Sequence, residues 1–153
     1  MTKEKITLAA FQPDIPQNVG ALMRLTTGMD VPLHIIEPCG FVWDEKKIKQ
    51  SAMDYRDNAI LTRHKNWDEF CNSIAPRRII LLTTKTETSL YDFHFKADDV
   101  LLLGRESAGV PDWVHNATPY HVKIPMRGKI RSFNMAMAGA ITLAEALRQT
   151  AQI

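Results

Sequence analysis

The chain of 153 residues lacks the features that mark secreted and membrane proteins. Its two cysteines, Cys39 and Cys71, are too few for the disulfide framework of a small secreted domain. No apolar run approaches the about 20 residues that a membrane-spanning helix needs. The first apolar stretch, residues 6–11, is also too short for the core of a signal peptide. These absences predict a cytoplasmic protein with reduced thiols and no membrane partner.

A strong net charge is missing as well, because 19 Lys and Arg residues stand against 17 Asp and Glu residues. A net charge of +2 does not by itself indicate a nucleic-acid partner. The positive charge gathers near the C-terminus, where residues 121–153 contain five Lys or Arg residues and a single Glu. Three of the five lie in Arg127-Gly-Lys-Ile-Arg131. From charge alone, a solvated loop explains this basic segment as well as a phosphate contact does.

The usual signatures of nucleotide, metal and nucleophile sites are absent too. Residues 104–109 have the glycine spacing of a phosphate-binding loop, but Val110 and Pro111 follow where Lys and Ser or Thr are required. No Gly-x-Gly-x-x-Gly is present, and the histidines and cysteines show no metal-ligand spacing. No serine or cysteine lies in a nucleophile-elbow motif. The sequence therefore predicts no metal site and argues against a nucleoside-triphosphate pocket.

What is present predicts one α/β domain, residues 1–153. Residues 78–82 and 99–103 are continuous apolar runs, which are typical of strands in parallel sheets with both faces covered. Further strands are expected at 6–11, 33–36 and 120–124. Helices are expected from an N-cap at Asn18 to Gly28, from Asp44 to Lys49, from Asn66 or Asp68 onward, and from Asn134 to Gln152. This alternation predicts a mainly parallel sheet with helices on both faces.

Ligands of open α/β sheets bind outside the carboxyl ends of the strands. The unusual residues of this chain fall in the loops that occupy this edge. These loops follow Phe11, Leu82, Leu103 and Ile124.

Three segments carry a family resemblance, and they are Pro16-Gln-Asn-Val-Gly-Ala-Leu-Met-Arg24, Leu103-Gly-Arg-Glu-Ser-Ala-Gly-Val-Pro111 and Ile124-Pro-Met-Arg-Gly-Lys-Ile-Arg-Ser-Phe-Asn134. In this order, over essentially the whole chain, they resemble the three motifs of the SPOUT superfamily of RNA methyltransferases, in its SpoU (TrmH-like) branch. Shorter segments make the chain similar to the minimal tRNA (cytidine/uridine wobble-position)-2′-O-methyltransferases. These are Leu33-His-Ile-Ile-Glu-Pro38, Trp43-Asp44, Asp54-Tyr55, Thr62-Arg-His64 and Leu82-Thr-Thr-Lys85.

The resemblance implies properties that periodicity does not show. Members fold as an α/β domain whose C-terminal part forms a deep trefoil knot, bind S-adenosyl-methionine in that knot and work as homodimers. They methylate a ribose 2′-hydroxyl. For this chain the resemblance implies the wobble nucleotide in the anticodon stem-loop of a leucine-type tRNA.

The resemblance also implies a cofactor site. By match to the family, S-adenosyl-methionine lies against the backbone at Leu82, Thr83, Gly104, Ile124 and Met126, and Ser132 and Asn134 complete the pocket. Glycines in such loops let the backbone approach an adenosine group closely. Ser132 and Asn134 are equally suited to capping the last helix, and both roles are compatible.

Arg24 is the expected catalytic residue, by match to the family motif Asn-x-Gly-x-x-x-Arg. A guanidinium stays protonated in proteins, so it suits pairing with an RNA phosphate and stabilising the developing alkoxide better than acting as a base. Asn18 is expected to fix the segment that carries Arg24. Glu106 is expected to pair with Arg24 or with an arginine of the partner subunit, or else to cap its own loop.

RNA contacts are expected at Tyr55 and at three residues of the basic segment, Arg127, Lys129 and Arg131. A partner subunit is expected on the last helix, where Ala136, Ala140, Ala144 and Leu147 lie at helical spacing, although packing within the chain explains the same spacing.

Two alternative functions remain open. One is 2′-O-methylation at another tRNA position or in ribosomal RNA, although the chain starts directly at its first strand, which favours a small target. The other is a non-catalytic RNA-binding module with the same fold.

Overall fold

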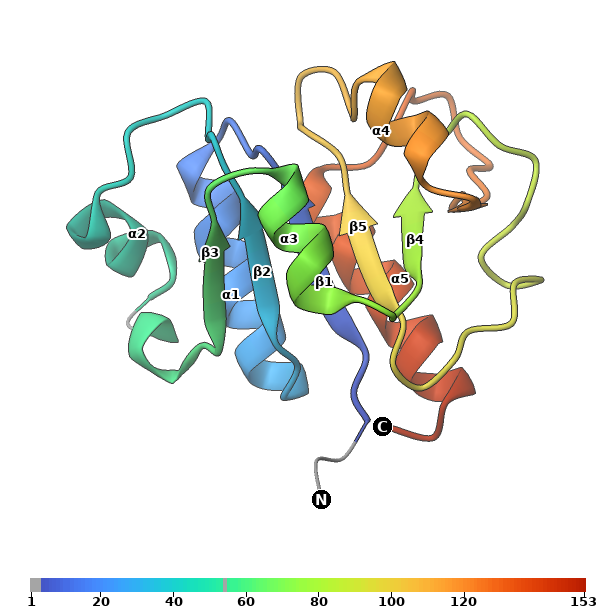
Figure 1. Ribbon diagram of the computed structural model, residues 1–153, viewed down its shortest axis with the longest axis horizontal. Coiled ribbons are helices and arrows are strands. Elements are labelled where there is room, and N and C mark those ends of the chain that lie inside the picture. Colours follow the sequence, from blue (N-terminus) through green and yellow to red (C-terminus); the bar gives the residue numbers. More distant parts are fainter. Residues whose placement is uncertain (1–3, 54) are drawn as a thin grey trace.

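The core of the molecule is a parallel sheet of six strands, seen in a computed structural model that describes residues 4–53 and 55–153 (Figure 1). Asp54, part of one segment that carried the family resemblance, lies outside the described residues. The strand order is β3-β2-β1-β5-β4-β6, and every neighbouring pair is parallel. The strands are β1 (Thr7–Phe11), β2 (Leu33–Ile36), β3 (Leu61–His64), β4 (Ile79–Leu82), β5 (Val100–Leu103) and β6 (Tyr120–Val122).

Helices cover both faces of this sheet, as the sequence predicted (Figure 1). Behind it in the view of Figure 1 lie α1 (Pro16–Met29) and α5 (Met135–Gln149), and α2 (Glu45–Ser51) packs against α1 at the left of the sheet. In front lies α3 (Trp67–Ile74), and α4 (Asp112–Ala117) lies beyond the carboxyl ends of β4 and β5, where its Val114 joins the core cluster on the α3 side. A 3-10 turn, η1 (Tyr55–Asn58), follows α2. Within the described ranges, no helix has both the length and the apolar character needed to cross a membrane.

The central strands are apolar on both faces because both faces are covered. In β1, Leu8 and Ala10 join the core under α1 and α5, whereas Ala9 and Phe11 join the core under α3 and α4. In β5 every residue is buried. The continuous apolar runs therefore have the cause that the sequence analysis gave them.

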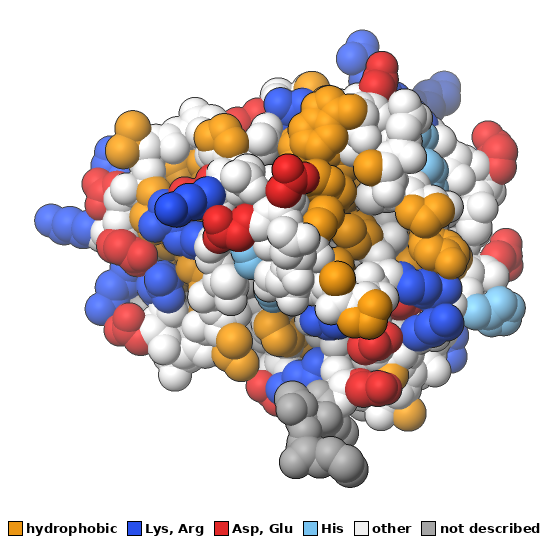
Figure 2. All heavy atoms as spheres, in the orientation of Figure 1, with side chains coloured by type: hydrophobic (Ala, Val, Ile, Leu, Met, Phe, Trp, Pro, Cys, Tyr) orange, Lys and Arg blue, Asp and Glu red, His pale blue; other side chains and the backbone are white. Residues whose placement is uncertain are grey.

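An aromatic cluster covers the carboxyl end of β1 on the α3 and α4 side. The rings of Phe11, Trp67 and Trp113 meet edge to face, with centroids 5.9 to 6.0 Å apart. Edge-to-face contact is a favoured arrangement for aromatic rings. Figure 2 shows hydrophobic side chains gathered on this face beside α3. The thin front layer is therefore closed by large rings rather than by long helices.

The start and end of α1 differ from the prediction. Asn18 is not its N-cap, because the helix begins at Pro16 with Ile15 in the cap position. Proline fits the first turn of a helix, where an amide hydrogen is not required. The helix also continues past Gly28 to Met29 and ends at Asp30, which has a φ of 55°.

Other helix starts were predicted well. Asp44 caps α2, Asn66 caps α3 and Asn134 caps α5, each through its side-chain oxygen. The sequence analysis missed β3, η1 and α4, and it extended the last strand two residues beyond Val122 and the last helix three residues beyond Gln149.

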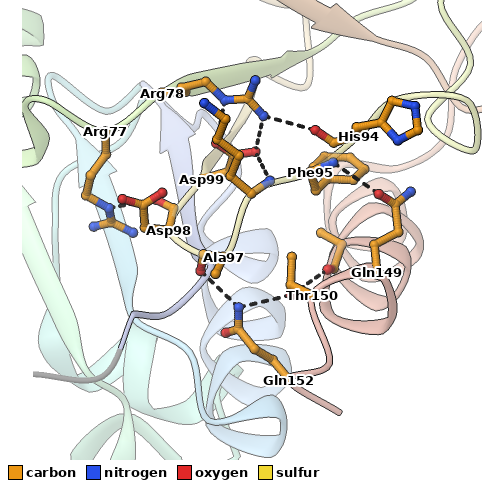
Figure 3. A network of polar contacts seen from close by, with 12 residues as sticks. Arg77, Arg78, His94, Phe95, Ala97, Asp98, Asp99, Gln149, Thr150 and Gln152 are labelled. Atoms are coloured by element: carbon orange, nitrogen blue, oxygen red, sulfur yellow. Dashed lines mark hydrogen bonds and ion pairs between the residues drawn. The ribbon is translucent and has the colours of Figure 1, made fainter.

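A polar contact fastens the end of α5 to the connection between β4 and β5, close to a network at the amino ends of these strands (Figure 3). Asp99 has no exposed surface, and its carboxylate accepts hydrogen bonds from Arg78 Nε at 2.8 Å and Nη2 at 2.7 Å. The amide of Phe95 donates to Gln149 Oε1 in α5 at 3.0 Å. A buried carboxylate requires such partners. This network lies at the edge of the sheet opposite to the loops that the sequence analysis selected.

Two histidines form a close pair on β2 and β3. His34 Nδ1 and His64 Nε2 are 2.7 Å apart, and the two rings stack on each other and meet Phe70 in T-shaped contacts. Burial, followed by the nearby charges of His64 and Arg77, lowers the pKa of His34 from 6.5 to about 4. The folded chain therefore holds fewer protons at this site than the unfolded chain does between these two pH values.

We expect this pair to make the free energy of unfolding depend on pH. A folded-state pKa below the unfolded value gives stability that is present above pH 6.5 and is lost as the pH falls toward about 4. Urea unfolding at several pH values should show that the free energy of unfolding falls less between pH 6.5 and about 4 in His34→Gln than in the wild type. His94→Gln, which changes an exposed histidine, serves as the control. The prediction would be contradicted if the free energy of unfolding depended on pH equally in all three proteins.

Candidate functional site

A cavity of about 290 Å³ opens at the carboxyl ends of β4 and β5, beside the start of α5. Six of the seven residues expected to contact a cofactor line it. They are Leu82, Thr83, Gly104, Ile124, Met126 and Ser132. The seventh, Asn134, is not among the lining residues. The structure thus brings three segments far apart in the sequence to one cavity, at the edge of the sheet where ligands of α/β folds bind.

The loop after β5 forms one wall of the cavity through a tight turn. Arg105 and Gly109 exchange backbone hydrogen bonds of 3.2 and 2.9 Å. A Cβ atom on Gly104 would lie 2.8 Å from Gly109 Cα, so a side chain at this position would force the turn open. Gly109 itself has a φ of 66°, in the left-handed region that favours glycine. Both glycines are thus explained by the turn itself.

Glu106 fastens this turn to the start of α1. Its carboxylate accepts hydrogen bonds from the backbone amides of Asp14 at 3.1 Å and Ile15 at 2.9 Å, and from Asn18 Nδ2 at 3.1 Å. The first amides of a helix lack partners within the helix, and Ile15 has no side chain that can supply one. Glu106 fills this role from 91 residues away.

The expected pairing of Glu106 with Arg24 is therefore wrong for the single chain. Across the part of the chain that the structure describes, no acidic side chain is close enough to Arg24 for an ion pair. The alternative of loop capping comes closer, although the segment that Glu106 caps is α1 rather than its own loop.

Asn18 joins α1 to the start of α5. It is 6% exposed, and its Oδ1 accepts a hydrogen bond of 3.1 Å from Asn134 Nδ2. Asn134 Oδ1 in turn accepts from the amides of Ala136 and Met137, which begin α5. The side-chain amide of Asn18 thus donates a hydrogen bond to Glu106 through Nδ2 and accepts one from Asn134 through Oδ1. These two partners fix its orientation.

Arg24 does not line the cavity. It is exposed on α1 and lines a separate hollow with Tyr55, which is 48% exposed, and with Thr27. Asn18 lies within α1, the helix that also carries Arg24, two residues after its start. Within one chain, Arg24 and the expected cofactor residues line two different surfaces.

The basic segment contributes unevenly to the cavity. Arg131 lines it, whereas Arg127 and Lys129 are exposed outside it. The expected apolar face of α5 is also incomplete, because Leu147 is 1% exposed and belongs to the core of its own chain. Over residues 4–53 and 55–153, no three His, Cys, Asp or Glu side chains are grouped so as to hold a metal ion.

Several residues at the site escaped the sequence analysis. Lys85, Arg105, Ser107 and His115 line the cavity, and Asp14 lies beside it. Lys85 was part of a segment that carried the resemblance, and Asp14 lies in a loop at the carboxyl edge. Their location in these segments was the only sign in the sequence that they lie at the site, because their side-chain types alone did not indicate a functional role.

Comparison with known proteins agrees with this geometry. The model of the SpoU rRNA Methylase family matches residues 5–144. A relative from Beijerinckia indica, named tRNA (cytidine(34)-2'-O)-methyltransferase, is 46% identical over 93% of this chain and 90% of its own length. A solved structure described as "Structural insights into the 2-OH methylation of C/U34 on tRNA" is 35% identical over 95% of this chain and 96% of that chain, with a TM-score of 0.90.

A more distant structure shares the fold. The SpoU methyltransferase AviRb from Streptomyces viridochromogenes, solved in complex with AdoMet, has a TM-score of 0.85 at 24% identity. The alignment covers 97% of this chain and 62% of that one. Because the family match spans most of its length and the Beijerinckia relative is 46% identical, this chain belongs to the SpoU methylase family of RNA methyltransferases.

Proposed function

We propose that the protein transfers a methyl group from S-adenosyl-methionine to the ribose 2′-hydroxyl of nucleotide 34 in tRNA. The observation that carries this proposal is the cavity lined by residues 82–85 and by the second and third motif segments, which Glu106 and Asn18 fasten to the helix that bears Arg24. The name of the Beijerinckia relative supports the choice of nucleotide, and the AdoMet complex of the Streptomyces protein supports the cofactor.

The cavity fits S-adenosyl-methionine in chemical character. Its lining includes the aliphatic side chains of Leu82, Ile124 and Met126, which suit an adenine ring, and the close turn at Gly104 presents bare backbone. Ser132 adds a hydroxyl. The cofactor supplies a methyl group on a sulfonium. We assign to Asn134 an indirect role, which it exerts through Asn18 and the start of α5.

Arg24 is proposed to bind an RNA phosphate and to stabilise the 2′-oxygen as it loses its proton. Its exposure leaves the guanidinium accessible to RNA. We propose further RNA contacts at the exposed Tyr55, Arg127 and Lys129, and at Arg131 on the cavity. The target is proposed to be the anticodon stem-loop of a leucine tRNA, which rests on the resemblance alone.

A homodimer is also part of the proposal. Arg24 and the cavity lie apart in one chain, so a second copy is a means of bringing such residues together. The exposed Met137 and the half-buried Ala140 and Ala144 offer an apolar surface on α5. Light scattering at micromolar concentration should give the mass of two chains. The mass of one chain would contradict the dimer.

The trefoil knot is supported by the path of the chain after β6. Thr83 donates a backbone hydrogen bond to Val122 on one side, and Lys123 exchanges two with Thr88 and Leu90 on the other. The segment at 122–123 is thus flanked on both sides by parts of the connection from β4 to β5 before it continues to α5. We propose that residues 1–153 act as one methyltransferase domain in the cytoplasm, with Cys39 and Cys71 as free thiols.

Two other functions compete with this one. Methylation of another tRNA position or of ribosomal RNA would use the same cavity and Arg24. A non-catalytic RNA-binding module would need neither the cavity nor the contacts of Asn18 with Glu106 and Asn134. Calorimetry with S-adenosyl-methionine separates the catalytic functions from the module.

We expect S-adenosyl-methionine to raise the melting temperature of the protein, because a ligand that binds only the folded state stabilises it. Mass spectrometry of tRNA from cells that lack the protein should show an unmethylated ribose at nucleotide 34 of leucine tRNAs. No thermal shift at millimolar ligand would contradict the enzymatic function. An unchanged ribose 34 would contradict only the substrate.

The Arg24→Ala variant should bind S-adenosyl-methionine about as tightly as the wild type, because Arg24 is not among the residues that line the cavity. Its rate of methylation should fall by a factor of about 100 or more, on the scale of losing one transition-state donor. Arg24→Lys should recover little activity, since an ammonium group lacks the planar fork of a guanidinium. Ser132→Ala should instead weaken cofactor binding first. Calorimetry and a single-turnover assay measure the two effects, and a weakened affinity in Arg24→Ala with an unchanged rate would refute the assignment.

A further inference from the structure

A second side-chain contact links the cavity loop to the start of α1. Ser107 Oγ donates a hydrogen bond of 2.5 Å to Asp14 Oδ2. The two residues are 93 positions apart in the sequence. Ser107 lines the cavity, whereas Asp14 precedes α1 by two residues. This contact therefore crosses the same gap as the contacts of Glu106.

The two links act on the same residue. Glu106 accepts a hydrogen bond from the backbone amide of Asp14, and the neighbouring Ser107 donates one to its side chain. Consecutive residues of the cavity loop thus hold Asp14 by its main chain and by its carboxylate. The hydrogen bond from Ser107 thus adds a contact on the side chain of Asp14 to the three hydrogen bonds that Glu106 accepts across the same gap.

The loop after β2 also packs against Asp14. A Cβ atom on Gly40 would lie 2.4 Å from Asp14 Cβ, and the amide of Gly40 donates to the carbonyl of Pro13 at 3.0 Å. Gly40 therefore lies close against Asp14, and a side chain at position 40 would collide with it. Asp14 Oδ1 is buried and has no hydrogen-bond partner among the described residues, so Oδ2 carries the polar contacts of this carboxylate.

The carboxylate is held in its charged form. The hydrogen bond from Ser107 is the main cause that lowers the pKa of Asp14 below its ordinary value. An ionised carboxylate only accepts hydrogen bonds, and bonds to a charged acceptor are roughly twice as strong as neutral ones. The serine therefore has one fixed role in the pair, that of donor.

We propose that Asp14 and Ser107 form a positioning pair that sets the cavity loop against the start of α1, so that cofactor binding and the placement of Arg24 depend on each other. The inference rests on the proposed function. Neither residue is required to touch the reacting atoms. Ser107 acts on the cavity wall at residues 104–109, and Asp14 acts on the helix that carries Arg24.

The test uses the full chain with S-adenosyl-methionine and a leucine tRNA anticodon stem-loop. We expect Ser107→Ala and Asp14→Ala each to raise the dissociation constant of S-adenosyl-methionine and to lower kcat at saturating cofactor and RNA, each by about tenfold, the scale of one hydrogen bond to a charged group. The double variant should be no worse than the worse single variant, because both changes remove one shared contact. Ser107→Thr keeps the hydroxyl and should restore both quantities.

A stability control separates positioning from general damage. Asn66→Ala removes one capping hydrogen bond, from the amide of Glu69 at the start of α3. It should lower the melting temperature but leave kcat and the dissociation constant unchanged.

The proposal is overturned if Ser107→Ala behaves like Asn66→Ala, or if the effects of the two single variants multiply in the double variant. If the wild type methylates RNA but the variants match it, only the positioning pair is wrong. If the wild type binds the cofactor without methylating RNA, the proposed function fails, and the dissociation constants alone decide on the pair.

Discussion

The carboxylate of Glu106 is the contact on which the arrangement of the site depends. It accepts hydrogen bonds from two backbone amides just before α1 and from the side-chain amide of Asn18. Hydrogen bonds to a charged group contribute about 1.5 to 3 kcal/mol each, more than most surface ion pairs do. The positive end of the helix dipole adds to the attraction. A helix that is capped from a distant loop takes its position from that loop, so the cavity wall and the helix of Arg24 are set together.

The polar residues at the two edges of the sheet have different roles. At the amino ends of β4 and β5, the buried Asp99 pairs with the partly buried Arg78, and Gln149 holds the last helix to the nearby β4–β5 connection. At the carboxyl ends, polar side chains line an accessible cavity. The apolar strands between the two edges pack on both faces and resist deformation. The amino edge thus holds the strands and the last helix together, whereas the polar contacts of the carboxyl edge position the loops around the cavity.

Sequence reasoning succeeded where the signal is local. The apolar runs that became β4 and β5 and the capping residues Asp44, Asn66 and Asn134 are visible within a few positions. β3 was missed because two of its four residues are polar and exposed at the edge of the sheet. α4 has only six residues, fewer than a helical pattern needs.

Contacts between distant segments could not be predicted in the same way. Six of the seven cofactor candidates from the motif match line one cavity, whereas Glu106 contacts the start of α1 and not Arg24 within the chain. Nothing near Ile15 in the sequence shows that its amide is bound by a residue 91 positions later. Leu147 was expected on a surface for a partner but packs into its own core, because helical spacing does not tell which side of a helix the sheet covers.

Hydrogen exchange at the amides of Asp14 and Ile15 tests the central role of Glu106 most directly. In the wild type both amides should be protected, although they lie outside the strands and before the first helical residue. In Glu106→Ala they should exchange at least about tenfold faster, the factor expected for the loss of about 1.4 kcal/mol of local stability. The amides of β1 should keep their protection. Equal protection of Asp14 and Ile15 in the two proteins would show that the start of α1 does not depend on Glu106.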